Sequence, residues 1–138
     1  MEILIESNRF NVWNEESTDG TLGKSVANWL MIGLSRKGFS PKLEKKEFSW
    51  QLTIPKEDMV LYIKIQSIWK DAQEVGESML AWKILTGYKL INKSTILSFF
   101  KRANPERELY KLNWAIKEFI SSEQGIKILN MKEDLIEY

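Results

Sequence analysis

The sequence lacks two of the most chemically versatile residues, because none of its 138 positions is a cysteine or a histidine. Without cysteine there are no disulfides and no thiol nucleophiles, and without histidine there is no imidazole general base and no histidine pH switch. Zinc sites built from these two residue types are excluded as well. The lack of cysteine is also consistent with a reducing compartment, and we expect a cytoplasmic protein.

Long apolar segments and a strong net charge are also missing. No apolar run approaches the roughly 20 residues that a membrane-spanning helix needs. The amino terminus, Met1–Glu6, carries acidic residues where a signal peptide would carry lysine or arginine. The 20 basic and 19 acidic residues leave a net charge of only +1, so no overall field attracts nucleic acid or an anionic membrane. We therefore expect a soluble protein that does not bind membranes.

Aromatic residues, in contrast, are abundant. Six tryptophans, six phenylalanines and four tyrosines predict a bulky core, or a core together with an aromatic surface patch. The chain has no internal repeat and no linker-like tract, and its length suits one folding unit. We expect residues 1–138 to form a single domain.

The strongest structural pattern lies between Phe48 and Trp69. Apolar residues alternate with polar ones on both sides of a turn-forming segment at 55–58, which predicts an antiparallel hairpin with one buried face. The residues expected on that face are Phe48, Trp50, Leu52, Ile54, Leu61, Ile63 and Ile65. Alternation resumes at Leu80, Trp82 and Ile84, which predicts a third strand and a β-meander over residues 47–85.

Helices are expected both before and after this meander in the sequence. The first follows a polar, acidic loop, where Thr18 or Asp19 is suited to cap it, and it ends near Gly38. A short helix after Ser94 and a longer one beginning at Asn104-Pro105 follow the meander. With an N-terminal strand at Ile3–Ile5 and a possible edge strand at 126–129, the order predicts an α+β fold. Its antiparallel sheet would be covered by helices in a two-layer sandwich.

Carboxylates in the acidic loop are the first candidate for chemistry. Glu15, Glu16 and Asp19 are close enough in sequence to hold Mg²⁺ or Ca²⁺, or to divide acid and base roles. Their spacing matches no calcium loop, however, and Asp19 has a simpler role as a helix cap. We therefore expect no metal site and no cofactor, and we rank an enzyme using these carboxylates last.

A basic segment at 83–111 is the second candidate. It has seven cations with interleaved aromatic residues, a combination that is found where cations contact phosphates and rings stack on bases. The nucleic-acid surface would then centre on Lys101, Arg102, Arg107 and Lys111. Against this hypothesis, scattered lysines and arginines are common on solvated helix faces, and Phe99 and Phe100 are suited to fill a core.

Tryptophans provide the third candidate. Trp29, Trp50 and Trp82 fall on faces expected to be buried, whereas three others do not. The exceptions are Trp13, Trp69 and Trp114. Because tryptophan is enriched among the anchors of protein interfaces, we interpret these three as candidate contacts to another protein.

Three segments of the N-terminal half resemble a group of small uncharacterised bacterial proteins. They are Phe10–Ser17, the stretch Arg36–Phe39 that ends the first helix, and the aromatic strand around Trp50. Members of that group carry an acidic Trp-Gly-Trp segment where this chain has Glu-Phe-Ser-Trp at 47–50. The resemblance implies a bacterial α+β protein and supplies no catalytic residue.

Taken together, the sequence favours a non-enzymatic protein-binding module, such as an immunity or inhibitor protein that neutralises one partner. A nucleic-acid-associated protein using the 83–111 surface is the alternative.

Overall fold

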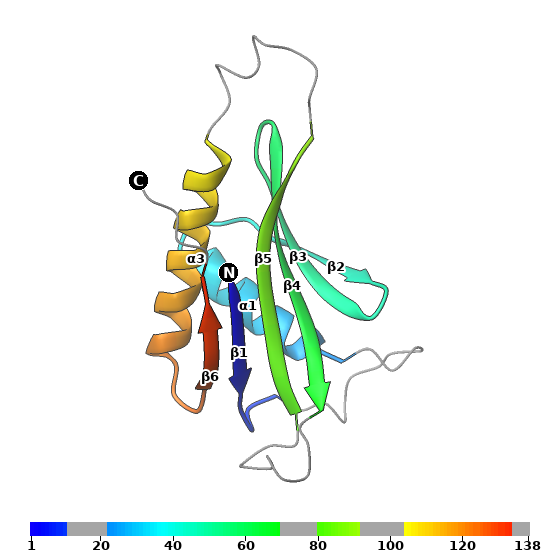
Figure 1. The fold of residues 1–138 in the computed structure, drawn as a ribbon, viewed down its shortest axis with the longest axis vertical. Coiled ribbons are helices and arrows are strands. Elements are labelled where there is room, and N and C mark those ends of the chain that lie inside the picture. The colour runs from blue at the N-terminus through cyan, green and yellow to red at the C-terminus, as the bar shows by residue number, and fades with distance from the viewer. Residues whose placement is uncertain (11–21, 70–79, 92–103, 134–138) are drawn as a thin grey trace.

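A computed structural model describes residues 1–10, 22–69, 80–91 and 104–133 of the chain. Its elements, in chain order, are β1 (Glu2–Glu6), α1 (Lys24–Arg36), β2 (Lys42–Lys46), β3 (Ser49–Pro55), β4 (Met59–Trp69), β5 (Leu80–Leu90), α3 (Pro105–Ser122) and β6 (Lys127–Lys132). The six strands form one sheet in the order β2-β3-β4-β5-β1-β6, and every neighbouring pair is antiparallel (Figure 1). The α+β prediction is confirmed.

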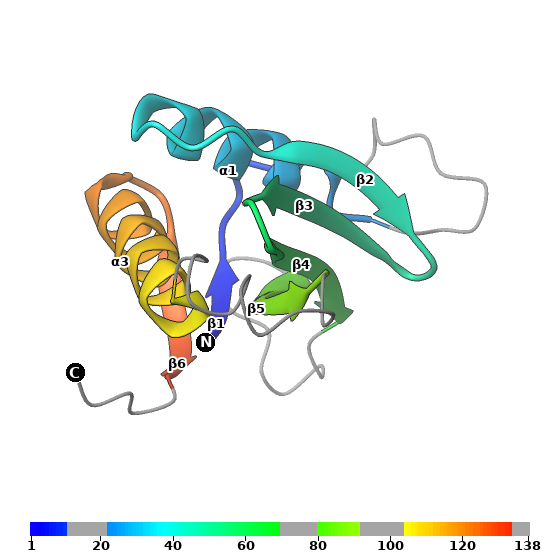
Figure 2. The ribbon, with the colours of Figure 1, turned by 90° about the horizontal axis from the view of Figure 1, so that it is seen from above.

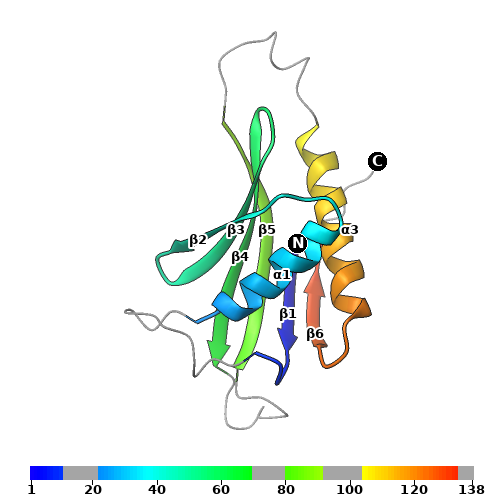
Figure 3. The ribbon, with the colours of Figure 1, turned by 180° about the vertical axis from the view of Figure 1, so that it is seen from behind.

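Both helices cover the same face of this sheet. Figure 2 shows α1 and α3 on one side, with β2 and β3 curling up beside α1. In Figure 3, α1 crosses in front of the central strands while α3 lies beside β6. The helices contact each other, α1 packs on β3 and β2, and α3 packs on β5 and β4. The structure is therefore the predicted sandwich of one helical layer on one antiparallel sheet.

The core fills the space between these two layers. Along β3 and β4 the predicted alternation is confirmed, because Leu52, Ile63 and Ile65 are fully buried and Trp50 is only 8% exposed. Trp82 of β5 is also buried, at 1%. Because antiparallel strands place alternate side chains on opposite faces, one register delivers all these residues to the helical side.

The prediction for Phe48 is wrong. The sequence continues the alternation through Phe48, but the structure contains an additional strand, β2, immediately before it, and Lys46 of β2 pairs with Ser49 of β3. Glu47 and Phe48 are therefore the two residues of a tight turn. Phe48 adopts a φ of 61° and is 70% exposed. The sequence did not predict β2, because its residues are mostly charged and have little β-propensity. The turn between β2 and β3 therefore places Phe48 in solvent despite the apolar pattern.

The helix boundaries follow the sequence signals in part. Asn104 caps α3 as expected, and its side-chain oxygen accepts hydrogen bonds from the backbone N–H groups of Glu106 (3.0 Å) and Arg107 (3.3 Å). The cap predicted for α1 is wrong, because α1 begins at Lys24 with Gly23 at the N-cap and no side-chain cap. Thr18, Asp19 and the helix expected after Ser94 lie outside the described residues. Within the described ranges, neither helix has the length and apolar character that a bilayer crossing requires.

Candidate binding surface

The three tryptophans predicted as anchors are placed very differently. Trp13 lies outside the described residues. Trp69 is the last residue of β4, where it pairs with Leu80 of β5, but its side chain is also outside the description. Trp114 belongs to α3 and is 58% exposed. Of the predicted anchors, Trp114 is thus the one whose surroundings can be analysed.

The exposure of Trp114 follows from the helical period. Leu112 and Ile116 are fully buried against the sheet. Trp114 is two residues from each of them, and two residues turn an α-helix by about 200°. The indole therefore has to project from the solvent side of α3. This geometry agrees with the sequence argument that Trp114 lies off the apolar stripe.

Charged neighbours surround the indole. The Lys117 ammonium lies 5.8 Å from the centroid of the Trp114 ring, within the range of a cation–π contact. The same ammonium forms a 2.7 Å ion pair with Glu133, which follows the last residue of β6. Glu118, one helical turn after Trp114, forms an ion pair with Lys37 at 3.2 Å. Lys117 is thus bound both to the indole and to the chain after β6.

A hollow of about 280 Å³ opens beside Trp114. Its described lining consists of Trp114, Lys117, Glu118 and Ser121, which follow one another at helical spacings along one side of α3. Tyr110, one turn before Trp114, is 45% exposed and extends the aromatic area. We call these five residues the Trp114 surface. It combines two aromatic side chains with one cation and one carboxylate.

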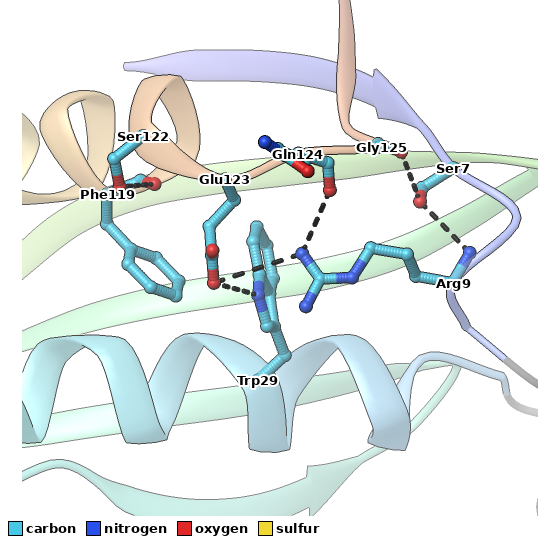
Figure 4. Close-up of polar contacts among 8 residues, drawn as sticks. All are labelled: Ser7, Arg9, Trp29, Phe119, Ser122, Glu123, Gln124 and Gly125. Atoms are coloured by element: carbon cyan, nitrogen blue, oxygen red, sulfur yellow. Dashed lines mark hydrogen bonds and ion pairs between the residues drawn. The ribbon is translucent and has the colours of Figure 1, made fainter.

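A second polar cluster joins the end of β1 to the connection between α3 and β6 (Figure 4). The indole N–H of Trp29 in α1 donates a 3.1 Å hydrogen bond to a carboxylate oxygen of Glu123. The Arg9 guanidinium lies 3.9 Å from the same oxygen and donates to the carbonyl oxygen of Gln124 at 3.2 Å. These contacts hold three distant segments together.

Aromatic packing continues this cluster into the core. The Trp29 ring lies 4.8 Å from that of Phe119 and 5.3 Å from that of Phe10, measured between centroids. The Arg9 guanidinium is 5.9 Å from the Trp29 ring. Ser7 completes the connection, because its hydroxyl donates to the carbonyl oxygen of Gly125 at 2.6 Å and accepts from the backbone N–H of Arg9 at 3.1 Å. Since these side chains satisfy one another, we assign the cluster a structural role: it fixes the C-terminal end of α3.

The described cations of the basic 83–111 segment do not all lie on one face. Lys101 and Arg102 lie outside the described residues, whereas Arg107 and Lys111 are exposed on α3. Lys83 alternates with the buried Trp82 and Ile84 of β5, and so lies on the sheet face opposite the helices. Lys83 pairs with Glu2 at 3.6 Å, and Lys111 pairs with Glu108 at 3.6 Å. The described part of the 83–111 segment is therefore divided between two sides of the molecule.

The carboxylates that motivated a metal hypothesis fall outside the description, since Glu15, Glu16 and Asp19 belong to the segment 11–21. Over the four described ranges, no group of three or more acidic side chains is close enough to hold a metal ion. The expectation that the chain needs no metal and no cofactor stays a prediction.

Sequence reasoning missed most of the polar contacts around these sites. It did not anticipate the pairing of Trp29 with Glu123 or of Lys117 with Glu133, because nothing in the local pattern links those positions. A signal for Tyr110 did exist. It precedes Trp114 by four residues and so falls on the same side of the helix.

Comparison with family models, with curated proteins and with solved structures found no match to this chain.

Proposed function

We propose that this chain is a non-enzymatic protein-binding module that contacts its partner through the Trp114 surface. The function we propose is that of an immunity or inhibitor protein, which binds one partner and neutralises it. The 58% exposure of Trp114 carries the proposal. The absence of cysteine supports a reducing compartment such as the cytoplasm.

The physical argument rests on what this indole offers to a partner. A tryptophan provides a large apolar area with few rotatable bonds, so ordering it on binding loses little entropy. Here the ring lies beside Lys117, whose ammonium is itself held by Glu133 at 2.7 Å. The hollow next to the ring can accept an apolar side chain of the partner, while Lys117 and Glu118 provide polar contacts at its rim. This arrangement is typical of an anchor within a polar rim.

The test begins with the capture of a binding partner from the native host, followed by its purification and titration. We expect Trp114→Ala to weaken the affinity at least tenfold, because an interface anchor contributes about 2 kcal/mol or more. Ile32→Ala is the matched control, since Ile32 is an exposed apolar residue of α1 at 52% exposure. A protein partner that binds Trp114→Ala and the parent equally well would overturn the proposal.

Salt dependence separates this function from the nucleic-acid alternative. Binding through an aromatic anchor changes little between low and high salt, whereas binding to phosphates falls steeply because counterions are released. If the captured partner is a nucleic acid whose affinity falls with Arg107→Ala and Lys111→Ala but not with Trp114→Ala, the alternative replaces the proposal.

A further inference from the structure

The strand β6 forms one edge of the sheet, and its composition differs from that of the other edge. All six of its residues are exposed, including three apolar ones, namely Ile128 (38%), Leu129 (37%) and Met131 (37%). Its four central residues, 128–131, carry no charge. An edge strand presents a row of backbone N–H and C=O groups without partners, and an uncharged, exposed edge is a template for another strand.

The opposite edge, β2, has the features that block such pairing. Three of its five residues are lysines: Lys42, Lys45 and Lys46. Charged side chains along an edge strand, lysine above all, oppose pairing with another strand, because pairing would remove their charge from water. The two edges therefore differ in charge: lysines occupy much of β2, whereas β6 carries none between its two ends, although its pairing with β1 has a register shift at Leu4/Ile5.

Charge specifies what the β6 edge can accept. Lys127 and Lys132 stand at its two ends, and both are exposed. Lys127 contacts the buried carboxylate of Glu6 at 3.8 Å while 69% of its side chain stays exposed. Lys132 lies opposite Glu2 in the backbone pairing of β6 with β1, and the Glu2 carboxylate lies 3.6 Å from Lys83. Because Glu6 and Glu2 lie on the β1 side, a carboxylate on a strand added beyond β6 would approach each lysine from the opposite side.

We propose that β6 accepts an extended segment of the partner protein as a seventh strand, and that this segment is apolar in its centre and acidic at both ends. The inference rests on the proposed protein-binding function and identifies the part of the partner that is bound. Backbone hydrogen bonds to β6 provide the affinity, and carboxylates beside Lys127 and Lys132 provide the selectivity.

The location of β6 joins this edge to the Trp114 surface. Figures 1 and 3 show α3 beside β6 at the same side of the molecule. The Lys117–Glu133 ion pair connects the helix to the residue after β6. A partner segment added to β6 therefore runs close to Trp114, so that one partner can use both features.

A second copy of this chain is a poorer occupant in the register that pairs the two apolar centres. In an antiparallel pairing of two β6 strands that places Ile128 opposite Met131, Lys127 of one copy lies opposite Lys132 of the other. Like charges directly opposite each other in a sheet are destabilising. The same comparison makes an acidic segment the better match.

The experiment uses the full-length protein, labelled with ¹⁵N, and the short synthetic peptide Ser-Glu-Ile-Thr-Val-Glu-Ser as the probe. Its glutamates have the four-residue spacing of Glu2 and Glu6, which lie opposite Lys132 and Lys127 on the β1 side because the pairing there shifts register. We expect amide chemical-shift changes at residues 127–132 that saturate as the peptide is added. Two control peptides are titrated into the same unmutated protein. One has lysine in place of both glutamates, and the other has proline in place of the threonine. Both should bind at least tenfold more weakly. Among protein variants, Lys132→Gln should weaken binding of the acidic peptide, while Lys64→Gln on the central strand β4 should not.

Each other outcome overturns the proposal. If the acidic peptide leaves the β6 amides unchanged, or if the lysine peptide binds equally well, the charge-selected edge does not exist. If sedimentation shows that the free protein dimerises and that Met131→Lys abolishes the dimer, the occupant is a second copy. Because the peptide titration needs no captured partner, it can fail while Trp114→Ala still abolishes partner binding, and the two proposals are thereby distinguished.

Discussion

The ring of Phe119 in α3 packs directly on the backbone of α1 at Gly33. A methyl group built on Gly33 would lie 2.5 Å from two carbons of that ring, which is closer than such atoms approach in proteins. The two helices therefore meet at a point where no side chain fits. This contact sets the distance between α1 and α3, and the Trp29 ring packs on the same Phe119 ring, 4.8 Å away between centroids.

Gly33→Ala should lower the free energy of unfolding by about 1–3 kcal/mol, because the added methyl forces apart two packed helices. Helix propensity alone predicts the reverse, a gain of about 1 kcal/mol from replacing glycine in a helix. Urea denaturation followed by circular dichroism measures the sign.

Gly87→Ala is the matched control. There the added methyl would meet the hydroxyl end of the Tyr62 side chain, which lies on the sheet face away from the helices and is only partly buried. Tyr62 can swing aside, so we expect a smaller loss than at Gly33. Equal losses at the two glycines would contradict the proposed close packing of α1 and α3.

Phe48→Gly should raise the free energy of unfolding by about 1 kcal/mol. Phe48 has a φ of 61°, and a residue with a side chain is strained in this left-handed region by roughly 1–2 kcal/mol. Its ring is 70% exposed, so its removal forfeits little burial.

Phe48→Ala provides the comparison, because alanine removes the ring and keeps the strain. Thermal melts of both variants should place the glycine variant clearly above the alanine variant. If both melt together, the backbone at this turn is not strained.

Trp50→Ala and Trp114→Ala should differ sharply in stability. Trp50 is 8% exposed between the sheet and α1, and truncating a buried tryptophan costs about 3–5 kcal/mol. Trp114 is 58% exposed, so its truncation should change stability by no more than about 0.5 kcal/mol. Urea midpoints of the two variants provide the measurement. An unchanged midpoint for Trp50→Ala would show that the inward face is misassigned.

Ser7→Ala should lower the free energy of unfolding by about 1–2 kcal/mol. The Ser7 hydroxyl is buried and bridges the carbonyl oxygen of Gly125 and the backbone N–H of Arg9, and both groups lose a partner when it is removed. Chemical denaturation measures the loss.

Ser35→Ala serves as the control for Ser7→Ala. Its exposed hydroxyl donates to the carbonyl oxygen of Met31 within α1, and alanine is the better helix former. We expect this variant to be as stable as the parent or slightly more so. A loss at Ser35 equal to that at Ser7 would argue against the bridging role of the Ser7 hydroxyl.

The sequence by itself determined the features that depend on local periodicity. The alternation around Trp50 and Trp82 placed these side chains on the buried face, because a pleated strand has a period of two. Asn104 followed by Pro105 marked the start of α3, because an amide cap and a proline in the first turn satisfy that end locally. The position of Trp114 off the apolar stripe of α3 indicated its exposure, because the helical period places it on the side away from Leu112 and Ile116.

The tertiary structure alone decided the features that depend on distant segments. Phe48 is exposed because β2 pairs with β3 and places Phe48 in the turn between the two strands. The charged sequence of β2 has little intrinsic preference for a strand. The hydrogen bond from Trp29 to Glu123 joins residues 94 positions apart, and β6 became an edge only through its pairing with β1. Such contacts are fixed by how the layers pack as a whole, and short-range patterns carry no record of them.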